Sequence, residues 1–225
     1  MSRDTTSPGH ERHVAFSLEV LPEGTRLRSV SATPAEAGGV RALRLQLTDA
    51  VALEGVPDVD YVDMPTFALL PTVFGNGTVE VDILARLTPQ APDYARAFAG
   101  VAFHVADDGQ EFECVYLRPL NGRTLDPPAP RDVRAVQYFS YPDWKYQRLR
   151  GDYPDGRYEA GADIGPGRWS RLRIDVEGSR VDVRVDGVPV LTGLAAKPRR
   201  PSGRVGLWVD IGTEAYFANL VISAR

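Results

Sequence analysis

Hydrophobic and polar residues alternate with a period of two in short runs along most of this chain. Such alternation is typical of β-strands that bury one face. The runs 40–47 and 78–87 show it clearly, and an Asp-Gly pair at 186–187 between two such runs is a strong hairpin signal. The pattern predicts about a dozen strands and no amphipathic helix. The expected strands are 13–21, 40–47, 66–70, 78–87, 100–105, 112–119, 135–140, 169–176, 180–185, 188–191, 203–211 and 215–222.

The spacing of these runs predicts the domain organisation. Turn signals, supplied by 21 glycines and 18 prolines, separate many short strands, which favours a β-sandwich or barrel. The polar start predicts a disordered tail over residues 1–13, followed by a single domain over residues 14–225. Two long stretches, 121–134 and 141–167, lack a strand pattern. Connections of this length in a compact domain are usually functional or mobile.

Charge and composition exclude several classes of function. The net charge of −4 predicts neither a nucleic-acid surface nor an anionic-membrane surface. No apolar run approaches the roughly 18 to 20 residues of a membrane span, and residues 1–13 lack the apolar core of a signal peptide. Cys114 is the single cysteine, so an internal disulfide is impossible. We therefore expect a cytoplasmic protein, although a secreted form without its leader would also fit.

Short motifs recur in order in the last third of the chain. They are Gly-Arg-Trp at 167–169, Val-Arg-Val-Asp-Gly at 183–187, Gly-Arg-Val-Gly-Leu-Trp at 203–208 and Ala-Tyr-Phe-Ala-Asn-Leu at 215–220. Their order resembles that of the concanavalin A-like lectin/glucanase superfamily, in particular its laminin-G-like bacterial members. Segments 99–103, 116–121 and 136–138 are similar to the same sub-family, so the resemblance covers about 75–222.

This resemblance implies a fold class and a site region. The expected fold is all-β, a concanavalin A-like jelly-roll sandwich of two curved antiparallel sheets. Related domains bind glycans on the concave sheet face or on the loops at its rim. Because a fold does not fix a function, the resemblance implies no particular reaction.

Alternation also divides the side chains of the central strands between two faces. One parity carries the valines and should face the core, and the other carries polar and aromatic groups. If the strands are neighbours, hydrogen-bonding groups beside flat rings gather on one face, as recognition of a sugar or polyol requires. The alternative is a solvated outer face with ordinary cross-strand pairs. The residues in question are His104, Tyr116, Arg118 and Gln137, joined by Glu80 and Asp82 from a further strand.

Two flanking segments extend this candidate binding surface. Arg118 ends a strand and leads through Asn121 into a long loop, where a guanidinium could hold a carboxylate or ring hydroxyls. It could instead form a structural ion pair with Glu113 or Asp82. The segment 141–150 interleaves aromatic and basic residues and is predicted to contact a ligand ring or, alternatively, to cover the sheet edge. Its ligand candidates are Tyr141, Trp144 and Tyr146.

Three residues are candidates for catalysis. Glu80 and Asp82 are similar to the Glu-x-Asp-x-x-Glu signature of laminarinase-like glucanases, but Ala85 stands where the third acid would be. Two close carboxyls suit retaining glycoside hydrolysis, whereas the alternative is a solvent-facing acidic strand. His104 is a candidate general base or, alternatively, a hydrogen-bonded structural residue.

A calcium site is common in the superfamily and is therefore an expectation of the resemblance. The run containing Asp58, Asp60 and Asp63 offers hard oxygen ligands, as does the Asp-Asp-Gly turn at 107–109. Neither matches a defined calcium loop, and acidic loops are usually only solvated. We expect no other cofactor.

These observations favour a lectin-like domain that binds a carbohydrate, a glycan or glycoside, or another polar small molecule. A second hypothesis is a small-molecule enzyme on the same face, a glycoside hydrolase or a biosynthetic cyclase-like enzyme. A third is a laminin-G-like protein-interaction module. A deep pocket with a perturbed carboxyl would favour the enzyme, a shallow aromatic groove the lectin, and a flat apolar patch the protein partner.

Overall fold

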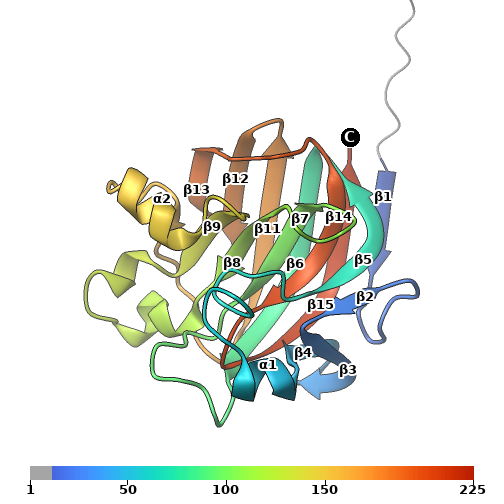
Figure 1. Cartoon of the computed structure of the whole chain (residues 1–225), viewed down its shortest axis with the longest axis horizontal. Helices are drawn as coiled ribbons and strands as arrows, with labels where there is room; N and C mark the ends of the chain where they lie inside the picture. The colour runs from blue at the N-terminus through green and yellow to red at the C-terminus, as the bar shows by residue number, and fades with distance from the viewer. Residues whose placement is uncertain (1–11) are drawn as a thin grey trace, which may run out of the picture.

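Two antiparallel sheets stack face to face in the computed structural model, which describes residues 12–225 (Figure 1). This arrangement confirms the predicted jelly-roll sandwich. Sheet A runs in the order β13 (Val188–Ala195), β12 (Arg180–Val185), β11 (Trp169–Glu177), β6 (Gly77–Leu87), β15 (Thr213–Ala224), β4 (Val40–Leu47) and β3 (Val30–Ala37), with β1 (Arg12–Phe16) paired to β15. Sheet B runs in the order β10 (Glu159–Ala160), β9 (Val136–Tyr141), β8 (Phe112–Leu117), β7 (Ala99–Val105), β14 (Gly203–Val209), β5 (Phe67–Phe74) and β2 (Arg26–Arg28).

Short helices occupy stretches that the hydrophobic pattern predicts as loops. They are α1 (Asp49–Glu54), α2 (Tyr146–Asp152) and the 3₁₀ turns η1 (Pro119–Asn121), η2 (Arg123–Leu125) and η3 (Arg131–Val133). No helix in residues 12–225 is long and apolar enough to cross a membrane. The strands β2, β3 and β10 were not predicted. Most of the predicted tail lies outside the described residues, but Arg12 and His13 already pair with β15.

Sheet A follows the alternation predicted for it. In β6, Val79 and Val81 are fully buried between the sheets, whereas Glu80 and Asp82 lie on the outer face. Both acids are engaged there by neighbouring strands. Arg171 Nη1 lies 3.0 Å from Asp82, Arg173 Nη1 lies 3.6 Å from Glu80, and Asn219 donates to Asp82 at 2.8 Å. The expectation that Glu80 and Asp82 share a face with Arg118 is therefore wrong, because β6 belongs to the other sheet.

The central strands of sheet B are buried on both faces. Every residue of β7 and β8 is buried, and every residue of β9 except Tyr141 is buried as well. One face packs on sheet A, and the other is covered by loops and α2. This covered face carries aromatic rings in contact: the ring centre of Trp208 lies 4.9 Å from that of Tyr116, in a tilted arrangement, and 5.5 Å from that of Phe139, in an edge contact. The alternative of a solvated outer face is therefore wrong for these strands, and the predicted polar and aromatic face is covered by other segments.

Close packing of this aromatic layer depends on glycine at position 100. Gly100 pairs with Tyr116 on one side and with Trp208 on the other. A Cβ atom at Gly100 would lie 2.1 Å from the carbonyl oxygen of Val115 and 2.6 Å from Tyr116 Cβ. Because no side chain fits there, glycine lets the two rings meet above the strand.

The position of His104 also departs from the predicted alternation. The pairing of β7 with β14 shifts register next to His104, which has a left-handed φ of 52°. Such a bulge reorients a side chain. His104 therefore turns toward sheet A, where Nδ1 lies 2.7 Å from Glu113 Oε2 and Nε2 lies 2.8 Å from the Gly75 carbonyl oxygen. Tyr138 donates to the other oxygen of Glu113 at 2.5 Å. His104 is thus absent from the face that carries Tyr116.

We expect His104→Ala to destabilise the fold by about 3 to 5 kcal/mol, because it leaves the buried Glu113 carboxyl without one partner. Chemical denaturation measures the change. The double variant His104→Ala, Glu113→Gln should recover part of the loss, since it removes the buried acid as well. A loss below about 1 kcal/mol in the single variant would show that the pair is not structural.

Candidate functional site

A cavity of about 460 Å³ opens between the covered face of sheet B and the segments that lie over it. Its volume falls in the range of small-molecule sites. The walls come from segments far apart in sequence, including the loop after α1, the loop before β7, the η1–η3 region and α2. The lining residues are Pro57, Asp58, Val62, Asp63, Tyr94, Arg96, Phe98, Tyr116, Arg118, Asn121, Arg131, Arg134, Tyr146, Gln147, Arg150, Asp210 and Ile211.

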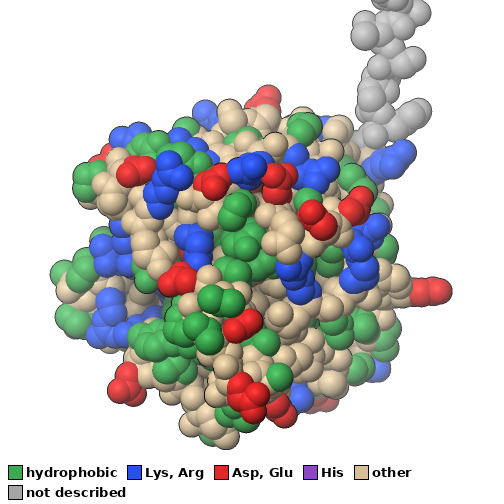
Figure 2. Space-filling model, in the orientation of Figure 1, with side chains coloured by type: hydrophobic (Ala, Val, Ile, Leu, Met, Phe, Trp, Pro, Cys, Tyr) green, Lys and Arg blue, Asp and Glu red, His purple; other side chains and the backbone are tan. Residues whose placement is uncertain are grey.

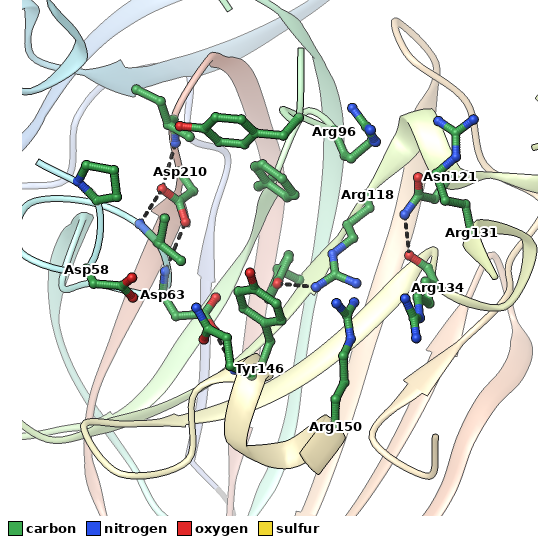
Figure 3. A pocket seen from close by; sticks show the side chains of 17 residues that line it. Asp58, Asp63, Arg96, Arg118, Asn121, Arg131, Arg134, Tyr146, Arg150 and Asp210 are labelled. Carbon is green, nitrogen blue, oxygen red and sulfur yellow. Dashed lines mark hydrogen bonds between the residues drawn. The ribbon is translucent and has the colours of Figure 1, made fainter. Parts of the chain in front are cut away.

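Charge is distributed unequally along this pocket. Figure 3 shows the aspartates at one end and the arginines at the other, with the ring of Tyr146 between them. We call these the acidic end (Asp58, Asp63 and Asp210) and the arginine end (Arg96, Arg118, Arg131, Arg134 and Arg150). On the surface, some of the Lys and Arg side chains lie over α2 and the η segments on the left of the view, and others lie at the top and on the right (Figure 2).

Asp210 holds the acidic end together. It follows β14, and its carboxylate accepts hydrogen bonds from the backbone N–H groups of Val62 at 3.0 Å, Asp63 at 3.0 Å and Ile211 at 2.7 Å. Val62 and Asp63 have left-handed φ values of 74° and 54°, which are unusual for residues with a side chain. Such strain persists only where surrounding contacts impose it, and it concentrates at functional sites. Asp210 supplies those contacts.

Asp63 projects from this strained loop into the pocket wall. Its side chain is buried, and Oδ2 accepts the backbone N–H of Tyr146 at 2.8 Å. Burial raises the pKa of Asp63 to about 7, with a smaller contribution from the charge of Asp210, and outweighs the lowering by the Tyr146 N–H, Arg118 and Lys145. A carboxyl group with a pKa near neutrality can accept or release a proton at the pH of the cell.

The arginine end is organised around Glu159 of β10. Arg118 Nη1 donates to Glu159 Oε1 at 2.6 Å, and Arg150 Nη2 donates to the same oxygen at 2.5 Å. Arg134 Nε lies 3.4 Å from Glu159 Oε2. Burial alone would raise the pKa of Glu159, but the hydrogen bond from Arg150 and the charge of Arg118 lower it. Glu159 therefore remains ionised and fixes these guanidinium groups.

Arg118 is held on its other side as well. Its Nη2 donates to the Tyr116 hydroxyl at 2.6 Å and to Gln137 Oε1 at 2.8 Å. Because Arg118 also donates to Glu159, one hydrogen-bond network joins four side chains, those of Tyr116, Arg118, Gln137 and Glu159. A buried guanidinium with fixed partners is a preorganised electrostatic element of the pocket floor.

A cluster around Lys197 fastens α2 over the sheet. Lys197 donates to the Tyr153 hydroxyl at 2.7 Å and lies 5.0 Å from the centre of the Trp144 ring. At the start of α2, Lys145 Nζ lies 2.5 Å from Asp58 Oδ1. These contacts place Trp144 outside the pocket, as a support for the helix that carries Tyr146.

The predicted ligand residues are therefore only partly brought together. Tyr116, Arg118, Asn121 and Tyr146 line the pocket, and Gln137 supports Arg118 from behind. Tyr141 stacks on Phe112 at 5.2 Å and does not line the pocket. Neither His104 nor Trp144 lines it.

Sequence reasoning missed the acidic end as a functional group. Asp63 was predicted only as a calcium ligand, and nothing in the sequence marks Asp210, because a single acid after an apolar strand is no motif. The arginines at 123–134 belonged to a loop whose length predicted a role, without indicating which one. The acids of 58–63 do not assemble as expected for calcium: among the described residues, no three His, Cys, Asp or Glu side chains form a group that could hold a metal ion.

The family match and the jelly-roll fold define a member of the concanavalin A-like lectin/glucanase superfamily. Residues 66–223 match the family described as the 3-keto-alpha-glucoside-1,2-lyase-like domain. The chain belongs to this family. A comparison with functionally described proteins gives no match.

Solved structures share this fold at low sequence identity. A carbohydrate-binding module, CBM66, from Bacillus subtilis is 14% identical with a TM-score of 0.51, covering 86% of this chain and 94% of the other. The beta-glucanase of Bacillus licheniformis is 12% identical with a TM-score of 0.51, covering 97% of this chain and 100% of the other. A Bacillus subtilis protein with a galectin-like fold is 10% identical with a TM-score of 0.53, covering 96% and 100%. These likenesses show the fold alone.

We expect Asp63→Asn to stabilise the protein at pH 8 but not at pH 4. Between the ordinary pKa of 3.8 and the raised value of about 7, the folded chain retains a proton that the unfolded chain releases. Stability is therefore lost as pH rises through this window, by about 4 kcal/mol once Asp63 is ionised. The asparagine keeps the acceptor for Tyr146 N–H and removes this loss.

Denaturation of both proteins between pH 4 and pH 8 measures the difference. Asp155→Asn is the control, because its pKa is lowered by a hydrogen bond from Arg157 on the surface. That substitution should give no gain at pH 8. If the difference in unfolding free energy between Asp63→Asn and wild type is the same at pH 4 and pH 8, the raised pKa is contradicted.

Proposed function

We propose that this domain is an enzyme that eliminates the aglycone from an oxidised glycoside bound in the pocket, with Asp63 as the general base. The family description names a 1,2-lyase-like activity on 3-keto-α-glucosides. A ketone at C3 of a sugar acidifies the hydrogen on C2. Removal of that proton gives an enolate, which forms the C1–C2 double bond as the C1–O bond breaks. The aglycone leaves as an alcohol after it takes up a proton, so no oxidant or reductant is consumed.

The observation that supports this proposal is the buried Asp63 carboxyl in the pocket wall. Its pKa of about 7 matches the requirement for a base that is partly ionised at neutral pH. The left-handed backbone at Asp63 and its support by Asp210 are consistent with a side chain held in a set position for reaction.

Arg118 supplies a fixed positive charge for the same reaction. Its charge already acts on the Asp63 carboxyl, which places the two groups within electrostatic reach. Negative charge that develops on the C3 oxygen during proton removal is stabilised by a preorganised cation that needs no reorganisation. Tyr94, Phe98 and Tyr116 provide ring faces in the pocket wall against which a sugar can pack.

The test is incubation of the protein with a 3-keto-α-glucoside that carries a chromogenic aglycone. We expect release of the aglycone together with ultraviolet absorbance from the conjugated enone. The rate should rise with pH through about 7, because only the ionised Asp63 accepts a proton. Asp63→Asn should lower the rate by a factor of about 100 to 10,000.

Glu80→Gln and Asp82→Asn are the matched control variants. They neutralise the two acids that the glucanase-like motif suggests, on the outer face of sheet A. Both should retain the wild-type rate. Loss of activity in these variants with full activity in Asp63→Asn would contradict the proposal, and binding of the glycoside without release of the aglycone would instead assign the pocket to carbohydrate recognition alone.

A further inference from the structure

The arginine end of the pocket contains more cations than its acid can neutralise. Five arginines line it, and Glu159 is the carboxylate that pairs with three of them, Arg118, Arg134 and Arg150. Across the described part of the chain, no carboxylate lies within ion-pair distance of the other two, Arg96 and Arg131. Two guanidinium groups of this end are therefore without an anionic partner.

The surroundings of Arg96 show that these cations lie close to one another. Arg96 Nη1 donates to the carbonyl oxygens of Asp93 and Ala95, each at 2.6 Å, which positions the group without neutralising it. Burial lowers the pKa of Arg96, and the charges of Arg131 and Arg118 lower it further, whereas the charge of Asp93 opposes this effect only in part. Cations that repel one another in a partly desolvated site are stabilised by an incoming anion.

The arrangement of the pocket gives such an anion one preferred place. In Figure 3, Arg96, Arg118 and Arg131 lie on the side opposite Asp58, Asp63 and Asp210. An anionic group is attracted to the first set and repelled by the second. A saccharide with an anionic substituent would therefore bind in one orientation, with its substituent away from Asp63.

We propose that the arginine end binds an oxyanion carried by the saccharide, so that the pocket selects acidic glycosides over neutral ones. A uronic acid carboxylate and a sugar phosphate share the required chemistry, because a guanidinium binds either through paired N–H donors. The inference rests on the proposed function and names its substrate class. Arg96 and Arg131 are the specificity-determining residues, whereas Arg118 is already engaged by Tyr116, Gln137 and Glu159.

Calorimetric titration of the full chain with matched glycosides tests this assignment. The ligands are methyl α-glucopyranoside, its uronate, its 6-phosphate and free inorganic phosphate. They lack the C3 ketone, so they can bind without eliminating. We expect the uronate, the phosphate ester or both to bind at least tenfold more tightly than the neutral glycoside, and their relative affinities identify the anion. Added salt should weaken that binding.

Arg131→Gln should lower the affinity for the charged glycoside by about ten- to a hundredfold and leave the neutral one unchanged. Arg131 is suited to this test because it lies on η3, outside the Glu159 network. Arg168→Gln, an exposed arginine that does not line the pocket, is the control for net charge and should bind like wild type.

The outcomes separate this inference from the proposed function. Equal binding of neutral and charged glycosides, with elimination of the neutral keto-glycoside intact, would overturn the oxyanion site alone. Free phosphate that binds as tightly as the phosphate ester would also overturn it, since the saccharide would then add nothing. Absence of any glycoside binding, together with absence of elimination, would overturn both.

Discussion

The need to cover the second face of sheet B determines most of this structure. That face carries Trp208, Tyr116 and Phe139, each buried and in contact with another ring. Burial of one such ring removes on the order of 200 Å² from water, worth roughly 5 kcal/mol before conformational entropy is counted. The loops and α2 gain stability by docking over these rings. The pocket is the volume that these covering segments leave open above the polar edge of the face, so the same packing creates the core and the site.

Several residues of the pocket are held in energetically unfavourable states. Val62 and Asp63 adopt left-handed backbone conformations that cost on the order of 1 to 3 kcal/mol each. Desolvation disfavours the ionised form of Asp63 and raises its pKa to about 7. Asp210 offsets part of these costs with three backbone hydrogen bonds. A site that lowers stability in this way is the expected signature of residues selected for chemistry or binding and not for folding.

Hydrophobic periodicity and turn residues predicted a β-sandwich or barrel, and the resemblance to the concanavalin A-like superfamily specified the sandwich. The alternation is clear in strands such as β11, where buried and half-buried residues alternate. The same rule failed for β7–β9, although the signal was present. Ala102, Cys114 and Phe139 are apolar on the parity assigned to the polar candidate binding face, as strands covered on both sides require. No residue type marks the bulge that turns His104. Asp63 and Asp210 lie 147 positions apart, so only the folded chain reveals that they meet.

The acids that stabilise the sheet and the acid that lies in the pocket are different residues. The glucanase-like motif suggests Glu80 and Asp82, whereas Asp63 lines the pocket. Glu80 and Asp82 are held by Arg171, Arg173 and Asn219 in a ladder that stabilises the outer surface of sheet A. A carboxylate already bonded to a guanidinium is a poor proton acceptor, whereas Asp63 accepts only a backbone N–H. Because loops change more readily than paired strands, a fold of this kind can acquire a new reaction by altering the segments that cover it while its sheets remain the same. The position of Asp63, on a covering loop and not on a strand, follows that logic.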